Sequence, residues 1–169
     1  MAPLTVFDEL VLHPLLGDLP MGWLHRLALQ GSPVLRPTGH RLFRQDEPAD
    51  SFLLLGSGAV HLDVVVPGRG AVVIDEVGAH GVVGCSWLVP PYRRALGAVV
   101  ADEIRAVEFR AAEVRNLFGE DPALGLELTT RFVAILAGRL RTSSRRLAEL
   151  GAEHVCPARL PAAGPTALC

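Results

Sequence analysis

The sequence predicts an α+β domain in which an antiparallel β-sandwich or barrel is flanked by short N-terminal helices and followed by one long helix. Two patterns carry this prediction. Short apolar segments alternate with Gly- and Pro-containing turns about every 8–12 residues between positions 34 and 109. From position 124 to 150, an apolar residue then recurs every three or four positions. The chain has 169 residues, half of them hydrophobic, which suits one packed domain.

Two short helices are expected before the strands. The first covers residues 7–12. The second begins after Pro20, and its apolar face consists of Trp23, Leu24, Leu27 and Ala28. The sequence Gly31-Ser32-Pro33 is expected to end the helical pattern.

The predicted strands are short. They cover residues 34–36, 40–43, 51–55, 59–66, 71–77, 82–83, 98–101 and 104–109. Gly56-Ser57-Gly58 and Pro67-Gly68-Arg69-Gly70 are expected to be turns between successive strands. Many short strands with such turns are typical of an antiparallel sandwich or barrel.

The helical pattern returns after residue 109. A short helix is expected over residues 111–118, and Asp121-Pro122 then begins the long helix, with Asp121 as its N-cap. Gly151 is expected to end it. The apolar stripe consists of Leu124, Leu128, Phe132, Leu136, Leu140, Ser143, Leu147 and Leu150. The outer face is rich in arginine: Arg131, Arg139, Arg141, Arg145 and Arg146.

The distal half of this helix has a narrow apolar stripe, which favours a two-stranded coiled coil and therefore a homodimer. The alternative is a helix that folds back on its own domain. We predict one domain over residues 1–152, including the long helix at about 122–150. Residues 153–169 contain three prolines and are predicted to be a disordered tail.

Composition excludes several classes of protein. The formal net charge of −2 argues against general nucleic-acid binding. Cys85, Cys156 and Cys169 have no metal-ligand spacing, and their odd number favours a reducing compartment. The sequence begins without a secretory signal, and no apolar stretch has the roughly 18 residues of a membrane span. A cytoplasmic location with no membrane partner is expected.

Residues 15–150 resemble the cyclic-nucleotide-binding domain family. Pro37-Thr38-Gly39 precedes a strand and a turn that ends in Ala49-Asp50, as in the family's opening pattern. The segment from Leu54 to Val60 is similar to the next strand pair, with Gly58 at the family's glycine, and the segment from Gly78 to Gly84 is similar to the approach to its phosphate-binding cassette. The resemblance implies a catabolite-activator-like antiparallel β-roll, which is a jelly-roll-like double-stranded β-helix.

The cassette carries the chemistry that the resemblance implies. In the family, a Gly-Glu pair opens a short helix whose backbone N–H groups bind the cyclic phosphate. The Glu accepts a hydrogen bond from the ribose 2′-hydroxyl, and a later Arg pairs with the phosphate. Here Gly84 matches, Cys85 replaces the Glu, and Arg93 or Arg94, followed by Ala95, matches the arginine. A thiol is a weak acceptor and cannot replace a carboxylate.

The resemblance extends to other residues of the predicted site. Ser86-Trp87-Leu88-Val89-Pro90-Pro91-Tyr92 is similar to a divergent single-domain branch of the family, and Ser143 and Ser144 match a pair that lies over the purine. The predicted ligand-binding residues are Gly84, Cys85, Ser86, Trp87, Arg93, Arg94, Ala95, Ser143 and Ser144. Some have alternative roles.

Trp87 and Tyr92 suit buried anchors better than ligand contacts. Arg93 and Arg94 could instead be a solvated pair, and Ser143 could merely relax helix packing.

Regulators of the family continue into a helix-turn-helix, but only 18 residues follow Gly151 here. We therefore expect a single-domain member that does not bind DNA. Six histidines form no His-x-His pair, which argues against a metal enzyme of the cupin type. No histidine lies close to Cys85 in sequence, which argues against a cysteine enzyme or redox sensor. No catalytic residue, metal site or cofactor is predicted.

The resulting hypothesis is a stand-alone sensor module. It binds cAMP, cGMP or a related phosphate ligand and signals through a partner protein whose identity the sequence does not give. The alternative is a degenerate cyclic-nucleotide-binding fold that acts as a ligand-free dimeric scaffold for protein interactions.

Overall fold

The computed structural model describes residues 4–154, with side chains up to residue 149. The chain divides into two compact units, Met1–Phe132 and Val133–Cys169, and each is described by itself. The first unit contains the sheet, the short helices and the beginning of the long helix. The second contains the remainder of that helix.

The two N-terminal helices form where the sequence predicts them. Helix α1 spans Val6–Leu12, and a capping box at Thr5 and Asp8 fixes its start. The Asp8 carboxylate accepts a hydrogen bond from the Thr5 amide at 2.9 Å. Helix α2 spans Met21–Ala28 and buries Leu24 and Leu27. The Gly-Ser-Pro sequence that follows ends the helical pattern and begins the first strand.

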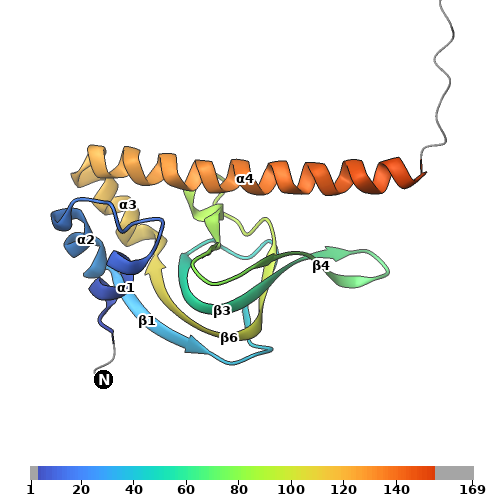
Figure 1. Ribbon diagram of the computed structural model, residues 1–169, viewed down its shortest axis with the longest axis horizontal. Helices are drawn as coiled ribbons and strands as arrows, with labels where there is room; N and C mark the ends of the chain where they lie inside the picture. Colours follow the sequence, from blue (N-terminus) through green and yellow to red (C-terminus); the bar gives the residue numbers. More distant parts are fainter. Residues whose placement is uncertain (1–3, 155–169) are drawn as a thin grey trace, which may run out of the picture. The chain divides into compact units, whose positions relative to one another are not determined.

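Six antiparallel strands form one sheet. They are β1 (Gly31–Arg36), β2 (Arg41–Phe43), β3 (Ser51–Val66), β4 (Gly70–Val77), β5 (Val82–Val83) and β6 (Gly97–Arg110). The main order is β1-β6-β3-β4, with β2 paired to β6 and β5 paired to β3. Figure 1 shows β3 and β6 as long curved strands, so that the sheet coils on itself. The predicted antiparallel β-roll is therefore confirmed.

The central strands are longer than predicted. We expected a turn at Gly56-Ser57-Gly58, but β3 continues through these residues, and the two strands expected after residue 97 are the single strand β6. The pairing of β3 with β6 instead shifts register repeatedly between Leu55 and Val60. Gly58 has φ +83°, and a Cβ there would lie 2.1 Å from the carbonyl oxygen of Glu103. The glycines therefore bend the ladder without ending it.

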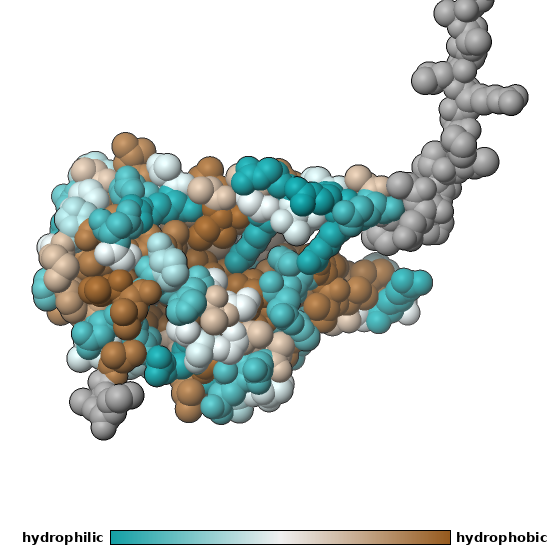
Figure 2. All heavy atoms as spheres, viewed as in Figure 1, coloured by the Kyte–Doolittle hydropathy of each residue, from teal (hydrophilic) through white to brown (hydrophobic). Residues whose placement is uncertain are grey.

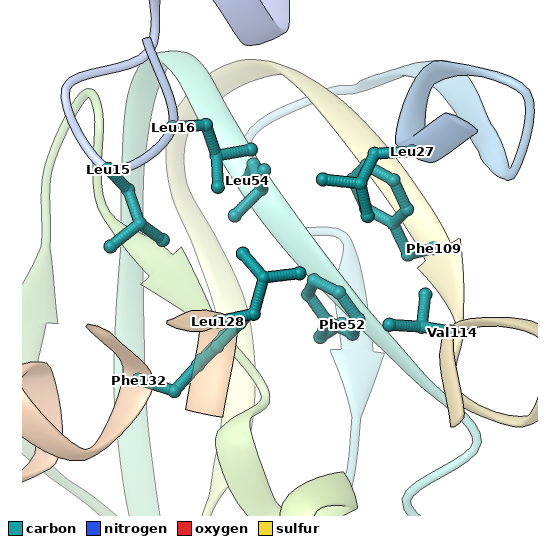
Figure 3. A pocket seen from close by; sticks show the side chains of 9 residues that line it. All are labelled: Leu15, Leu16, Leu27, Phe52, Leu54, Phe109, Val114, Leu128 and Phe132. Atoms are coloured by element: carbon teal, nitrogen blue, oxygen red, sulfur yellow. The ribbon is translucent and has the colours of Figure 1, made fainter. Parts of the chain in front are cut away.

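Alternation along β3 supplies two apolar cores. Leu53 and Leu55 belong to the cluster inside the roll, which also contains Phe43, Val60, Leu62, Val77, Val83, Ala98, Val100, Ile104 and Ala106. Phe52 and Leu54 point to the opposite face. There they meet Leu15, Leu16, Leu27, Phe109, Val114, Leu128 and Phe132, which Figure 3 shows converging on one small cavity. Its volume is about 10 Å³, barely the space of one water molecule, so this is packed core.

Helix α3 (Ala111–Glu120) leads directly into α4 (Pro122–His154). The Asp121 carboxylate accepts a hydrogen bond from the Leu124 amide at 3.1 Å, as its predicted N-cap role requires. Trp23 and Arg26 of α2 donate to the same carboxylate. The backbone of α4 continues past Gly151, where we expected it to end. Most of the predicted tail, residues 155–169, lies outside the described residues.

None of the helices that the structure describes has the length and apolar character that a membrane span requires.

Candidate functional site

The segment between β5 and β6, residues 84–96, forms a compact loop around one short helix. Gly84 has φ +91° and precedes the 3₁₀ helix η1 (Cys85–Leu88). A Cβ at Gly84 would lie 2.6 Å from Nη1 of Arg94. Glycine is needed here both for the left-handed backbone conformation and for the close approach of the guanidinium.

Arg94 is the central charge of this loop. Its side chain is buried, with the residue only 3% exposed. It donates from Nη1 to the Gly84 carbonyl and from Nη2 to the Ser51 hydroxyl, both at 3.3 Å. The guanidinium carbon lies 3.9 Å from the ring centroid of Phe43. Both hydrogen-bond acceptors are neutral, and Nε is buried without a hydrogen-bond partner.

Burial lowers the pKa of Arg94, while the charges of Asp50, Glu47 and Glu108 oppose that shift. An arginine remains protonated under such conditions, so the loop holds a buried positive charge. An anion that reaches this cation stabilises it, because a hydrogen bond between two opposite charges also gains their Coulomb attraction.

Arg93 points away from Arg94. Its Nη1 donates to the Asp46 carbonyl at 2.7 Å, and the side chain is exposed. The backbone here is extended and bridged to Pro48, while the Arg94 amide donates to the Glu47 carbonyl at 2.8 Å. Neighbouring side chains on extended backbone project to opposite sides. The structure thus separates the two candidate arginines, and only Arg93 fits a solvated side chain.

Trp87 and Tyr92 also differ in burial, as the two arginines do. Trp87 is fully buried, stacks on Phe52 with ring centroids 4.7 Å apart, and meets Phe132 edge to face. This is the anchoring role that we considered for it. Tyr92 is 41% exposed and lies under the guanidinium of Arg115, 4.8 Å from the ring centroid. The expectation that Tyr92 is a buried anchor was therefore wrong.

A hydrogen bond joins the two ends of the loop. The Ala95 amide donates to the Ser86 hydroxyl at 3.1 Å. Cys85 is buried at the start of η1, next in sequence to Gly84, whose carbonyl accepts a hydrogen bond from Arg94. Gly84, Cys85, Ser86, Arg94 and Ala95 are thus brought together. Ser143 and Ser144 belong to the second unit, where both are exposed on α4, and their part in binding stays a prediction.

Sequence reasoning missed the residues that hold Arg94 in place. Ser51 and Phe43 lie on β3 and β2, far from the loop in sequence, and nothing in their local pattern marks them. A second buried charge was also missed: Asp63 on β3 forms an ion pair with Arg41 on β2. Gly97 faces this pair, and a Cβ there would lie 2.3 Å from a carboxylate oxygen of Asp63. This ion pair joins β2 and β3 of the roll and lies outside residues 84–96.

Among the described residues, no group of three or more His, Cys, Asp or Glu side chains could hold a metal ion.

Comparison with known proteins identifies the family to which this fold belongs. The sequence model of the cyclic nucleotide-binding domain matches residues 34–121, which is more than half of the chain. The chain belongs to the cyclic nucleotide-binding domain family. Its fold is that of the predicted β-roll. In residues 4–154, α4 is the last element.

One curated relative is the "CRP-like cAMP-activated global transcriptional regulator" of Mycobacterium tuberculosis. It is 28% identical over 124 residues, which cover 73% of this chain and 54% of the relative. The chain therefore spans about half the length of the curated relatives that it matches.

Two solved structures show the same fold. A cyclic nucleotide-binding domain from Methylobacillus flagellatus has a TM-score of 0.74 and 22% identity, over 85% of this chain and 83% of its own. The c-di-GMP responsive global regulator CLP of Xanthomonas campestris has a TM-score of 0.68 and 18% identity, over 78% of this chain and 65% of its own.

Proposed function

We propose that this cyclic nucleotide-binding domain is a sensor module that binds cAMP, cGMP or a related phosphate ligand, with Arg94 as the counter-charge of the phosphate. The observation that carries the proposal is the state of Arg94. The guanidinium is buried, its two hydrogen bonds go to neutral oxygens at 3.3 Å, and Nε has no hydrogen-bond partner.

An anion would relieve this arrangement. Leaving a buried charged donor unsatisfied costs more than about 1–3 kcal/mol, the range for neutral groups. A phosphate oxygen next to Arg94 would accept from Nε and would supply the opposite charge that the neutral acceptors Gly84 and Ser51 lack. The backbone of residues 84–87 is the second part of the proposed phosphate site, as the family resemblance implies. Ser143 and Ser144 are proposed to add smaller contacts to the base.

The choice of ligand has support of two kinds. The Mycobacterium tuberculosis relative is described as activated by cAMP. The Xanthomonas campestris protein, with a similar fold, is described as responsive to c-di-GMP. A calorimetric titration should therefore include cAMP, cGMP and c-di-GMP, with inorganic phosphate as the minimal anion.

The decisive variant is Arg94→Ala, with Arg93→Ala as its matched control. Removing the counter-charge of a desolvated phosphate costs about 2–5 kcal/mol, so Arg94→Ala should weaken binding about 30-fold or more. Arg93→Ala should change affinity by less than about threefold, because Arg93 donates to Asp46 at the surface. Ser143→Ala should cost about tenfold or less, the size of one neutral hydrogen bond.

Circular dichroism should first show that Arg94→Ala folds. Equal affinities of the wild type and folded Arg94→Ala would refute the role of Arg94.

The second candidate function is the ligand-free scaffold. It is favoured by Cys85 in place of the family's Glu and by Arg94, which already bonds to the protein's own Gly84 carbonyl. Absence of binding heat with every titrant at millimolar concentration would select this function over sensing.

For assembly and output we propose a homodimer through the exposed leucines of α4, which passes its signal to another protein. The support is the exposure of Leu136, Leu140 and Leu147 on one helix.

A further inference from the structure

The guanidinium of Arg94 is enclosed by the protein itself. The residue is 3% exposed, and Nε is buried without a hydrogen-bond partner. The Gly84 carbonyl and the Ser51 hydroxyl accept bonds from Nη1 and Nη2, and the ring of Phe43 covers the guanidinium carbon. A phosphate oxygen must approach a guanidinium nitrogen to about 2.7–2.9 Å to form a charge-assisted bond. In this conformation, the enclosing atoms leave almost no surface for that approach.

The backbone of Arg94 is held more firmly than its side chain. The Arg94 amide donates to the Glu47 carbonyl at 2.8 Å, and the Arg94 carbonyl accepts from the Asp46 amide at 2.9 Å. Both bonds join the cassette to the segment between β2 and β3. The two bonds of the guanidinium are 3.3 Å long, beyond the usual range for N–H···O bonds. The side chain is therefore the part of Arg94 that can move at the lowest cost.

We propose that Ser51 regulates the phosphate site as a gate: its hydroxyl holds Arg94 in the enclosed conformation, and a ligand binds when the guanidinium leaves that hydroxyl. This inference rests on the proposed function. The phosphate and Ser51 compete for one guanidinium, so the apparent affinity is the intrinsic affinity multiplied by the fraction of molecules in which Arg94 is open. An enclosed state that is favoured about tenfold lowers the apparent affinity by about the same factor.

Ser51 is the part of the enclosure that a substitution can remove alone. Gly84 contributes a backbone carbonyl, and Phe43 belongs to the apolar cluster inside the roll. Ser51 is the first residue of β3, lies outside the cassette and is only partly buried. The direction of the change in affinity on its removal is informative. A hydroxyl that encloses Arg94 opposes binding, whereas a hydroxyl that orients Arg94 toward the ligand supports it.

The experiment titrates the wild type and Ser51→Ala with cAMP, cGMP and c-di-GMP by calorimetry and compares the nucleotide that binds most tightly. Ser51→Ala should bind it more tightly by about threefold or more, because a hydrogen bond from a charged donor is lost from the enclosed state alone. Ser51→Thr retains the hydroxyl and should match the wild type within about twofold. Ser57→Ala, at an exposed position of the same strand, is the matched control and should also match it.

Binding kinetics supply a second reading. With the same nucleotide carrying a fluorophore on its base, stopped-flow fluorescence gives the association rate constant. For the wild type it should lie at least about tenfold below the diffusional ceiling of about 10⁸–10⁹ M⁻¹ s⁻¹, since most encounters meet an enclosed guanidinium. Ser51→Ala should raise this constant by the same factor as the affinity, because the substitution changes the free protein.

The outcomes separate the gate from the sensing function. If folded Ser51→Ala gains less than about threefold in affinity, or binds more weakly, the gate is overturned while the sensing function stands. A wild-type association rate constant at the diffusional ceiling overturns it too, whether or not Ser51→Ala folds. Binding to Ser51→Ala but not to the wild type supports the gate. If neither chain binds any of the three nucleotides, the sensing function fails and the gate fails with it.

Discussion

The two halves of α4 have the same apolar periodicity but differ in burial. In the first unit, Leu124, Leu128 and Phe132 are at most 2% exposed. In the second unit, Leu136, Leu140 and Leu147 are 37%, 68% and 70% exposed. The difference shows that a helical stripe identifies an apolar face and does not say what covers it.

The first half is buried because side chains from several elements converge on it. Leu128 and Phe132 pack with Phe52 and with Leu15 and Leu16 from the segment between α1 and α2 (Figure 3). Arg131 fixes the helix from its polar side. Its guanidinium donates to the Leu15 carbonyl at 2.6 Å and bonds to Asp18 and Glu127. Arg131, which we placed on the arginine-rich outer face of the helix, thus makes structural contacts within the first unit.

The distal half of α4 is not alone in exposing apolar side chains. The β3–β4 hairpin exposes Val65, Val72, Val73 and Ile74, and Figure 2 shows apolar surface over this hairpin. Apolar side chains exposed on an edge strand are a template for association. Solution studies of assembly should therefore consider both surfaces.

The largest expected effect on stability comes from truncating a buried leucine in the first half of α4. An exposed leucine in the distal half provides the comparison. Leu128→Ala removes buried atoms from a packed core and should lower the free energy of unfolding by about 2–5 kcal/mol. The same substitution at Leu140 should change it by less than about 0.5 kcal/mol at concentrations where the chain is monomeric. Urea denaturation monitored by fluorescence gives both values. Equal losses at the two positions would show that the distal half is covered as well as the first.

Lowering the pH should destabilise the first unit, which contains the buried first half of α4. His13 is buried, and its Nδ1 accepts a hydrogen bond from the Leu15 amide at 3.2 Å. Burial and the neighbouring His80 lower the pKa of His13 to about 4. The unfolded chain binds this proton near pH 6.5, so stability is lost as pH falls from about 6.5 to 4. The loss should be about 2–3 kcal/mol.

The control for this prediction is His13→Asn, whose side chain does not titrate and retains an acceptor for the Leu15 amide. It should remove most of the pH dependence between 6.5 and 4 in urea denaturation. An unchanged slope in His13→Asn would assign the dependence to another group.

Introducing charges into the exposed leucine stripe of the distal half of α4 should have the smallest effect on stability. It should nevertheless change the assembly completely. Leu140→Glu combined with Leu147→Glu should convert the proposed dimer to a monomer in light scattering, because like charges would meet across a coiled-coil seam. The free energy of unfolding of the monomer should change by less than about 0.5 kcal/mol, since both residues are exposed. A wild-type chain that is already monomeric at micromolar concentration would refute the dimer.

Much of the fold could be predicted because its signals are local. The start of α4 at Asp121 follows from capping chemistry, and the position of β5 follows from Val82 and Val83 between glycines. The prediction failed at Gly56-Ser57-Gly58 because glycines allow both a turn and a bulge. Only the pairing of β3 with β6 selects the bulge.

The sequence by itself determined the order of the elements, the apolar faces, and the presence of a glycine and two arginines in the cassette. These features depend on periodicity, capping and motif spacing, and all three are set by residues that are close together in the sequence. Tertiary structure alone decided that Arg94 is buried while Arg93 is exposed, and that Trp87 is enclosed while Tyr92 is not. Each of these outcomes depends on residues that are distant in sequence, such as Phe43, Ser51 and Phe52, and burial is set by which of them the fold brings together.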